Sequence, residues 1–202
     1  MSLEIPMTEL EAVNAILGDI GERPVNSLVG VSSRLDVTRA QSSLNQVSRA
    51  VQQRGWWFNR ERIELTVDGS GYYNIPANCV RVEVESGGPT TGQYSKTPYL
   101  VVRGSKLYDT ANQTDVFTGA DTVVLIIHRL LDYEDLPSIV REYIYATASV
   151  RNQSRALGSQ HVSAELRDQA QVAMGLMQLE DVDSQNIDLT TGPRFFRIMQ
   201  DS

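Results

Sequence analysis

The longest helical pattern in the chain runs from Ser33 to Gly55. Apolar residues recur in it three or four positions apart, which places them on one face of an α-helix of roughly 22 residues. Ser33 is the predicted N-cap and Gly55 the predicted C-cap, with Arg54 at the negative end of the helix dipole. The residues predicted to be buried on this face are Val37, Ala40, Leu44, Val47 and Val51.

Three adjacent aromatic residues follow the long helix: Trp56, Trp57 and Phe58. The pattern changes here from helical spacing to alternation, so we expect the core to close at these residues and assign them a structural role. At least one tryptophan is predicted to be buried, because adjacent residues of a strand face opposite sides. The alternative is an exposed platform on which sugars or bases stack.

Three further stretches have helical spacing. The first runs from Thr8 to Asp19, with Thr8 and Glu11 at the spacing of a capping box. The next is expected between Asp135, as its N-cap, and Gly158, and the last from about Ser159 to Leu179. Because none of these helices can bury its apolar stripe alone, the four are expected to pack together. The residues predicted to face inward are Leu10, Val13, Leu17 and Ile20 in the first, Val140, Tyr143, Ile144, Thr147 and Val150 in the third, and Val162, Leu166, Ala170, Ala173 and Met177 in the last.

Between Arg60 and Ile127 apolar and polar residues alternate, which is the period of a half-buried strand. Asp68-Gly69-Ser70-Gly71 is a hairpin signal, with Tyr73 and Ile75 on the returning strand. The run from Thr122 to His128 is almost continuously apolar, as in a strand buried on both faces. We expect an antiparallel sheet of about six strands. The predicted fold class is α+β: a four-helix unit, of two N-terminal and two C-terminal helices, with a small antiparallel β-sheet domain inserted.

The predicted division assigns 1–59 and 128–180 to the two halves of the helical domain, 60–127 to the inserted β domain and 181–202 to a C-terminal arm. The arm is mostly polar and contains Gly192-Pro193, a composition that favours disorder in an isolated chain end. It also carries an apolar cluster without helical spacing, which we interpret as an anchor into a partner. The alternative is that the arm folds back on its own subunit. The predicted partner-binding residues are Arg194, Phe195, Phe196, Arg197, Ile198 and Met199.

Composition excludes several classes. The chain has 202 residues and a net charge of −7, and each of the segments 1–58, 59–127, 128–180 and 181–202 has more acidic than basic residues. No segment therefore has the positive surface with which proteins grip nucleic acid. No apolar run approaches the length of a membrane span, and the N-terminus lacks a secretion signal. Cys79 is the single cysteine, so no internal disulfide is possible.

Candidate chemistry is sparse. His128 and His161 have no second histidine or cysteine at ligand spacing, so we predict no metal site, and no glycine-rich loop predicts a nucleotide cofactor. Cys79 is interpreted as a half-buried apolar residue rather than a nucleophile, which would need a base such as His128 in contact. Three carboxylates before the third helix are interpreted as caps. The alternative is a glycan hydrolase with a carboxylate pair such as Glu134 and Asp135. The three are Asp132, Glu134 and Asp135.

Four segments, in this order, resemble the tail tubular protein A family, the head-to-tail adaptor or gatekeeper proteins of short-tailed bacteriophages. They are AVNAILGDIGERPVNSL, RGWWFN, YDTANQTDVF and RLLDYEDLPSIVREYI. The resemblance implies a structural virion protein of the tail, assembled in the host cytoplasm into a ring of twelve subunits. Its implied partners are the portal, the tubular nozzle (tail tubular protein B) and a tail fibre, with genomic DNA passing through the lumen without tight binding.

The leading hypothesis is therefore a structural adaptor with no catalytic residues and no cofactor. The alternative is a tail-associated glycan hydrolase that uses acidic residues. The two hypotheses differ in one observable, because hydrolysis requires two carboxylates facing each other across a cleft, roughly 5–10 Å apart.

Overall fold

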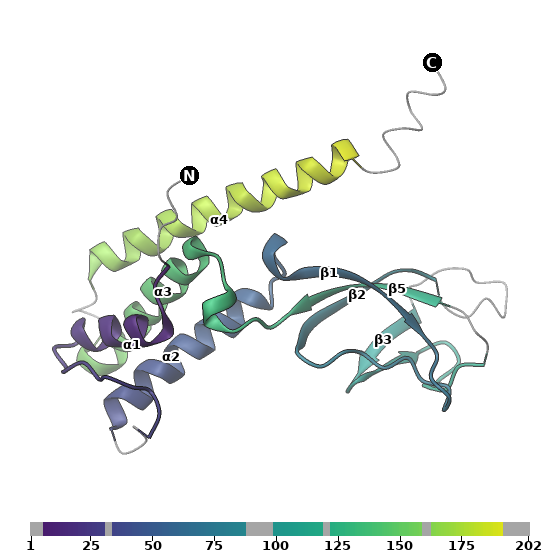
Figure 1. The fold of residues 1–202 in the computed structure, drawn as a ribbon, viewed down its shortest axis with the longest axis horizontal. Coiled ribbons are helices and arrows are strands. Elements are labelled where there is room, and N and C mark those ends of the chain that lie inside the picture. The colour runs from purple at the N-terminus through teal and green to yellow at the C-terminus, as the bar shows by residue number, and fades with distance from the viewer. Residues whose placement is uncertain (1–5, 31–33, 88–98, 119–121, 159–162, 192–202) are drawn as a thin grey trace. The chain divides into compact units, whose positions relative to one another are not determined.

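The computed structural model describes residues 6–30, 34–87, 99–118, 122–158 and 163–191 (Figure 1). The chain folds as two compact units: one combines Met1–Val51 with Asp132–Ser202, and the other is Gln52–Leu131. The first is built from α-helices and the second from β-strands, so the fold is α+β, as predicted.

In the helical unit, α1 spans Glu9–Gly18 and begins with the predicted capping box. The Thr8 side chain accepts a hydrogen bond from the Glu11 backbone, and the Glu11 carboxylate accepts one from the Thr8 backbone. The backbone bond from Thr8 is the main cause that holds the pKa of Glu11 below its ordinary value. Val13 and Leu17 are buried as predicted, together with Ala12 and Ile16, whereas Leu10 and Ile20 are half-buried.

The long helix, α2, spans Leu35–Gln52 and is shorter than predicted. It ends three residues before Gly55, so Gly55 is not its C-cap, and Ser33 lies outside the described residues. The predicted face is confirmed, since all five of its residues are buried: Val37, Ala40, Leu44, Val47 and Val51.

Two more helices complete the unit: α3 spans Ser138–Leu157 and α4 spans Ala164–Thr191. α3 packs against both α1 and α4. Gly158 ends α3 as predicted, but Asp135 is not its N-cap. Pro137 occupies that position, without a side-chain hydrogen bond. The buried predicted residues are Val140, Ile144, Leu166, Ala173 and Met177; Tyr143, Thr147, Val150 and Ala170 are half-buried, and Val162 lies outside the described residues.

The end of α4 differs from the prediction. The helix runs to Thr191, twelve residues past the predicted end at Leu179. Extending an existing helix needs only one hydrogen bond per added residue, whereas starting a new one carries the cost of nucleation. Residues 180–191 contain no glycine or proline, and the first strong helix breaker is Gly192-Pro193. Loss of apolar periodicity alone is therefore no reason for this helix to end.

The β unit begins with a short 3₁₀ helix, η1 (Trp57–Asn59), and has five strands in the described residues. They are β1 (Arg60–Thr66), β2 (Cys79–Gly87), β3 (Leu100–Arg103), β4 (Lys106–Asp109) and β5 (Thr122–Arg129). β5 lies between β1 and β2 in an antiparallel sheet, and β3 pairs with β4 in a second one. The central position of β5 explains its apolar run: Val123, Leu125, Ile126, Ile127 and His128 are all buried.

A small antiparallel β domain is confirmed, although about six strands were predicted and the described part of the chain has five, arranged in two sheets. The turn at Asp68 forms, with its carboxylate accepting hydrogen bonds from the backbones of Ser70 and Tyr72. The residues after the turn do not return along β1. The Leu107 backbone donates to Tyr73, and the Ile75 backbone donates to Ser105, so this segment lies along β4. Backbone pairing with β4 therefore replaces the predicted hairpin.

The core of the β unit lies among side chains from both sheets. The rings of Tyr73 and Phe117 meet edge to face, with centroids 4.9 Å apart. The buried residues of this core are Tyr73, Leu107, Phe117, Val123, Leu125 and Ile127. Within the described residues, the helices of both units are too short or too polar to span a lipid bilayer.

Candidate functional site

The acidic loop before α3 caps a helix, but not the one predicted. Asp132, Glu134 and Asp135 are exposed, beside the short 3₁₀ helix η3 (Tyr133–Asp135). Oε1 of Glu134 accepts a hydrogen bond of 3.1 Å from the backbone of Glu9, the first residue of α1. A carboxylate at the N-terminus of a helix accepts a hydrogen bond from an otherwise unpaired N–H group and interacts favourably with the positive end of the helix dipole. Glu134 thus supports α1, which lies 125 residues away in sequence.

Arg141 of α3 holds the same loop together, although sequence analysis did not single it out. Its side chain is only 8% exposed. The guanidinium donates to the backbone oxygens of Leu136 at 2.8 Å, Met7 at 3.1 Å and Glu134. The hydroxyl of Tyr133 donates in turn to the backbone oxygen of Arg141 at 3.1 Å, and burial raises the pKa of that phenol. One buried arginine therefore connects the acidic loop to the segment that leads into α1.

Two hollows lined by described residues, one in each unit, contain no carboxylate pair. In the β unit, a hollow of about 620 Å³ lies between β2 and β3, lined by residues 79–82, Val84 and 100–102. In the helical unit, a hollow of about 450 Å³ lies between α3 and α4, with Tyr143 and Met174 in its lining. Neither lining includes an aspartate or glutamate, so neither offers the acid and base of a glycan hydrolase.

The first and last segments of the β unit, residues 52–59 and 129–131, are connected by hydrogen bonds from buried side-chain amides. We call these segments the neck. Gln52 forms two hydrogen bonds with the backbone of Leu131: Nε2 donates to its oxygen at 3.1 Å, and Oε1 accepts from its nitrogen at 2.7 Å. Asn59 donates to the backbone oxygens of Gln52 and Arg129 and accepts from the backbone of Trp56. These two amides satisfy backbone groups that would otherwise be buried without partners.

Gly55 fits the neck for two reasons. Its φ of +78° favours glycine, and a Cβ at this position would lie 2.5 Å from Cε1 of the buried His128 ring. His128 lies at the end of β5, where its Nε2 is 3.9 Å from a carboxylate oxygen of Glu83. His128, predicted to be a boundary residue, therefore has a definite packing role. Its ring occupies the space that a side chain at position 55 would need.

The aromatic residues after Gly55 lie in the neck and η1. Trp56 is buried, with 7% of its surface exposed, whereas Trp57 and Phe58 are half-buried. The ring of Trp57 meets Trp56 edge to face at a centroid distance of 6.2 Å, and meets Phe58 in the same way at 5.2 Å. The structural role of the three residues stays a prediction, which this stacked and mostly covered arrangement favours over a flat exposed platform.

The remaining candidates do not form a reactive cluster. Cys79 begins β2 and is half-buried, and burial raises the pKa of its thiol, which is opposite to what a nucleophile needs. The charged groups that act on it are Arg129 and Glu61, not a histidine. His161 lies outside the described residues. Across the described ranges, histidine, cysteine and carboxylate side chains form no group of three that could hold a metal ion.

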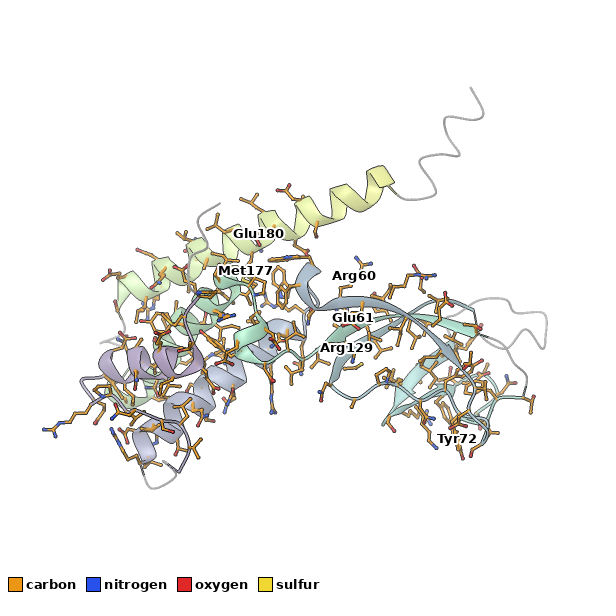
Figure 2. The ribbon with its side chains drawn as sticks, in the orientation of Figure 1. Arg60, Glu61, Tyr72, Arg129, Met177 and Glu180 are labelled. Carbon is orange, nitrogen blue, oxygen red and sulfur yellow. The ribbon has the colours of Figure 1, made fainter. Side chains whose placement is uncertain are left out.

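The last helix carries apolar residues on two sides. Its inner side is buried by Leu166, Ala173 and Met177 (Figure 2 labels Met177). Another set is exposed and lies on a different side of the helix, which has 3.6 residues per turn. We call it the outer stripe: Val172 at 64% exposure, Leu176 at 46%, Leu179 at 62% and Val182 at 55%. The predicted partner-binding residues, from Arg194 to Met199, lie outside the described residues.

Sequence analysis missed Gln52, Asn59 and Arg141. Two of them, Arg141 and Asn59, had a local signal. Arg141 is a charged residue beside Val140 on a face that is otherwise apolar, and Asn59 is the polar residue that ends the aromatic run. The signal shows that a polar group is buried, but it does not identify the distant backbone group that satisfies it.

Comparisons with known proteins converge on one family. A family model described as tail tubular protein matches residues 10–187, which takes in most of both units. A curated protein named "Tail tubular protein A", of Klebsiella phage KP34, is 29% identical over 146 residues. That alignment covers 71% of this chain and 72% of the relative.

Substitution of Gly55 by alanine tests the contact with His128, and Gly104 provides the matched control. Both glycines have positive φ, but only Gly55 has a side chain in the space that a Cβ would occupy. Gly104→Ala should cost about 1–2 kcal/mol of unfolding free energy for backbone strain. Gly55→Ala should cost a further ~1–3 kcal/mol for overpacking, measured by chemical denaturation. Equal losses for the two variants would contradict the proposed steric role.

Removal of the Arg141 guanidinium should destabilise the helical unit. Arg141→Met keeps much of the side-chain volume but leaves three backbone oxygens without their donor, so we expect a loss of about 3 kcal/mol or more. The control is Arg151→Met in the exposed part of the same helix, which should change stability by less than ~0.5 kcal/mol. Thermal and urea unfolding of both variants provide the measurement, and similar values for the two would refute this role for Arg141.

Proposed function

The chain belongs to the tail tubular protein family and is a structural protein of a bacteriophage tail, and we propose that it is the adaptor subunit that joins the portal to the tubular nozzle. The observation that carries the proposal is the family match over residues 10–187, together with a relative named tail tubular protein A. In this proposal the subunits form a ring of twelve in the virion tail, after assembly in the host cytoplasm. The ring contacts the portal, tail tubular protein B and a tail fibre.

The distribution of exposed apolar residues supports an assembly role. A ring subunit needs two different surfaces, because each copy contacts its two neighbours through unlike patches. The helical unit exposes the outer stripe of α4, and the β unit exposes Val101 and Val102 on β3. Tyr99 beside them is also exposed, and aromatic residues are enriched at protein interfaces. Each unit thus offers apolar surface for contact with another protein.

Catalysis is not part of the proposal. The carboxylate of Glu134 is engaged by α1, and the two hollows described above have no acidic lining. The glycan hydrolase alternative therefore has no observation that favours it. A structural subunit needs none of these groups for chemistry, and function is assigned from a site rather than from a fold.

A lumen for DNA is consistent with the charge distribution. Three arginines of the three-stranded sheet are paired with glutamates: Arg62 with Glu85, Arg81 with Glu83, and Arg129 with Glu61 (Figure 2 labels the last pair). Such exposed pairs contribute little to stability, but they neutralise the charges that would otherwise attract phosphate. We propose that DNA passes through the ring without being gripped.

Assembly with the portal tests the proposed function. Native mass spectrometry of the full chain mixed with the portal protein of the same phage should show twelve copies bound to one portal ring. The chain alone provides the reference, and an unrelated ring-shaped protein provides the control for non-specific association. A portal ring that binds no copies would refute the adaptor assignment.

Duplex DNA should not bind the isolated protein appreciably at physiological salt, because most basic side chains are balanced by acidic ones. A gel-shift titration measures this. Arg62→Glu should leave the result unchanged, whereas a DNA-gripping protein would lose affinity on that substitution. Salt-sensitive binding in the micromolar range would contradict the proposal.

A further inference from the structure

The outer stripe of α4 is an apolar surface that its own unit leaves uncovered. A helix that packs on one side of a small protein needs a single apolar stripe, and α4 already has one on its inner side. The outer stripe extends from Val172 to Val182, about 15 Å along the helix. Four exposed apolar side chains in one line are typical of a surface that another chain covers.

The hollow between α3 and α4 adjoins this stripe. Gly175, in its lining, is the neighbour of Leu176 and lies one turn from Leu179. A Cβ added at Gly175 would have no described atom within 4 Å, apart from atoms of its two chain neighbours and of the nearby helix backbone. Tyr143 and Met174 supply an aromatic and a thioether surface in the same lining. The hollow, of about 450 Å³, is therefore open beside the stripe, and its lining is mixed, with Thr147, Gln171 and Gln178 beside these two residues.

The charged residues around the outer stripe are mostly acidic, which favours a partner segment that carries positive charge. Of the six charged residues between Ala164 and Ser184, only Arg167 is basic. Glu180, on the last described turns of the helix, is exposed (Figure 2). Two copies of α4 packed on each other would bring like charges together, which costs free energy. A segment that combines large apolar residues with arginine would instead be complementary.

The chain itself contains a segment of this chemistry. Residues 194–199 read Arg-Phe-Phe-Arg-Ile-Met, four large apolar residues and two arginines. We propose that this segment of one copy docks on the outer stripe and hollow of α4 in a second copy. The inference rests on the proposed ring and deepens it by identifying one contact between neighbouring subunits. Because the two surfaces differ, the contact repeats from copy to copy, as ring formation requires.

Chain length argues for a second copy rather than the same one. Phe196 is five residues beyond Thr191, so a fully extended chain reaches about 17 Å. Gly175 precedes Thr191 by sixteen residues of helix, which is about 24 Å. A phenylalanine of the same copy therefore reaches at most the near end of the hollow, at Gln178, and only with the segment fully extended. The segment of a neighbour has no such limit.

A titration tests the docking surface. A fluorescent peptide with the sequence of residues 192–202 is added to the full chain that carries Phe195→Ser and Phe196→Ser, so that the protein's own segment does not compete. We expect saturable binding that Leu176→Asp weakens at least tenfold. Val29→Asp, another exposed apolar residue of the helical unit, should leave it unchanged. Circular dichroism confirms that each variant is folded. Absence of saturable binding up to about 1 mM, or equal binding to both variants, would overturn the proposal.

A complementation experiment separates docking between copies from docking within one. The Phe195→Ser/Phe196→Ser variant keeps its stripe, and the Leu176→Asp variant keeps its segment. Contact between copies predicts that the two variants associate when mixed and that each alone sediments as a monomer. Docking within one copy predicts instead that the wild-type chain stays a monomer at every concentration, because each segment then covers the stripe of its own copy, and that result would overturn the inference. If instead the variants associate but the wild-type chain fails to bind the portal, the docking contact stands and the adaptor assignment fails.

Discussion

Two buried side-chain amides make the insertion of the β unit possible. The chain leaves the helical unit after α2 and re-enters it before η3, so it runs twice through the neck. Backbone groups in such segments have no ladder of their own, and each one left unpaired would cost about 1–3 kcal/mol. Gln52 and Asn59 pair with the backbone of Leu131, Arg129 and Trp56 and so tie the outgoing segment to the returning one. Gly55 lets the buried ring of His128 approach the same point.

The acidic loop is a second case in which polar residues serve the fold. Glu134 caps α1, and Arg141 donates to three backbone oxygens around the loop. In the β unit, Asp109 accepts hydrogen bonds from the backbones of Ala111 and Asn112 and so shapes the turn after β4. These residues belong to the segments that resemble the family. Their hydrogen bonds connect parts of the fold to one another, which fits a family of structural proteins.

The apolar side chains, unlike these polar residues, are not all used within the subunit. Both units bury a core, yet α4 keeps a line of exposed valines and leucines beside an open hollow. An isolated protein gains nothing from such a surface, since exposed apolar area favours aggregation. In a tail that assembles from many copies, the same area becomes the favourable part of an interface, and the acidic residues around it restrict which segments fit. In the proposed contact, one face of α4 stabilises the subunit and another face stabilises the assembly.

Features that arise from local periodicity and from caps could be predicted from the amino-acid sequence. The buried face of α2, the capping box at Thr8 and the central strand β5 follow from spacing over a few residues, because a helix or strand repeats within that distance. Only the tertiary structure decided which polar groups meet. Arg141 and Met7 are 134 residues apart, and Gln52 and Leu131 are 79 apart, so no local pattern identifies them as partners. For the same reason the sequence recognised Glu134 as a cap but not that α1 is the helix it caps.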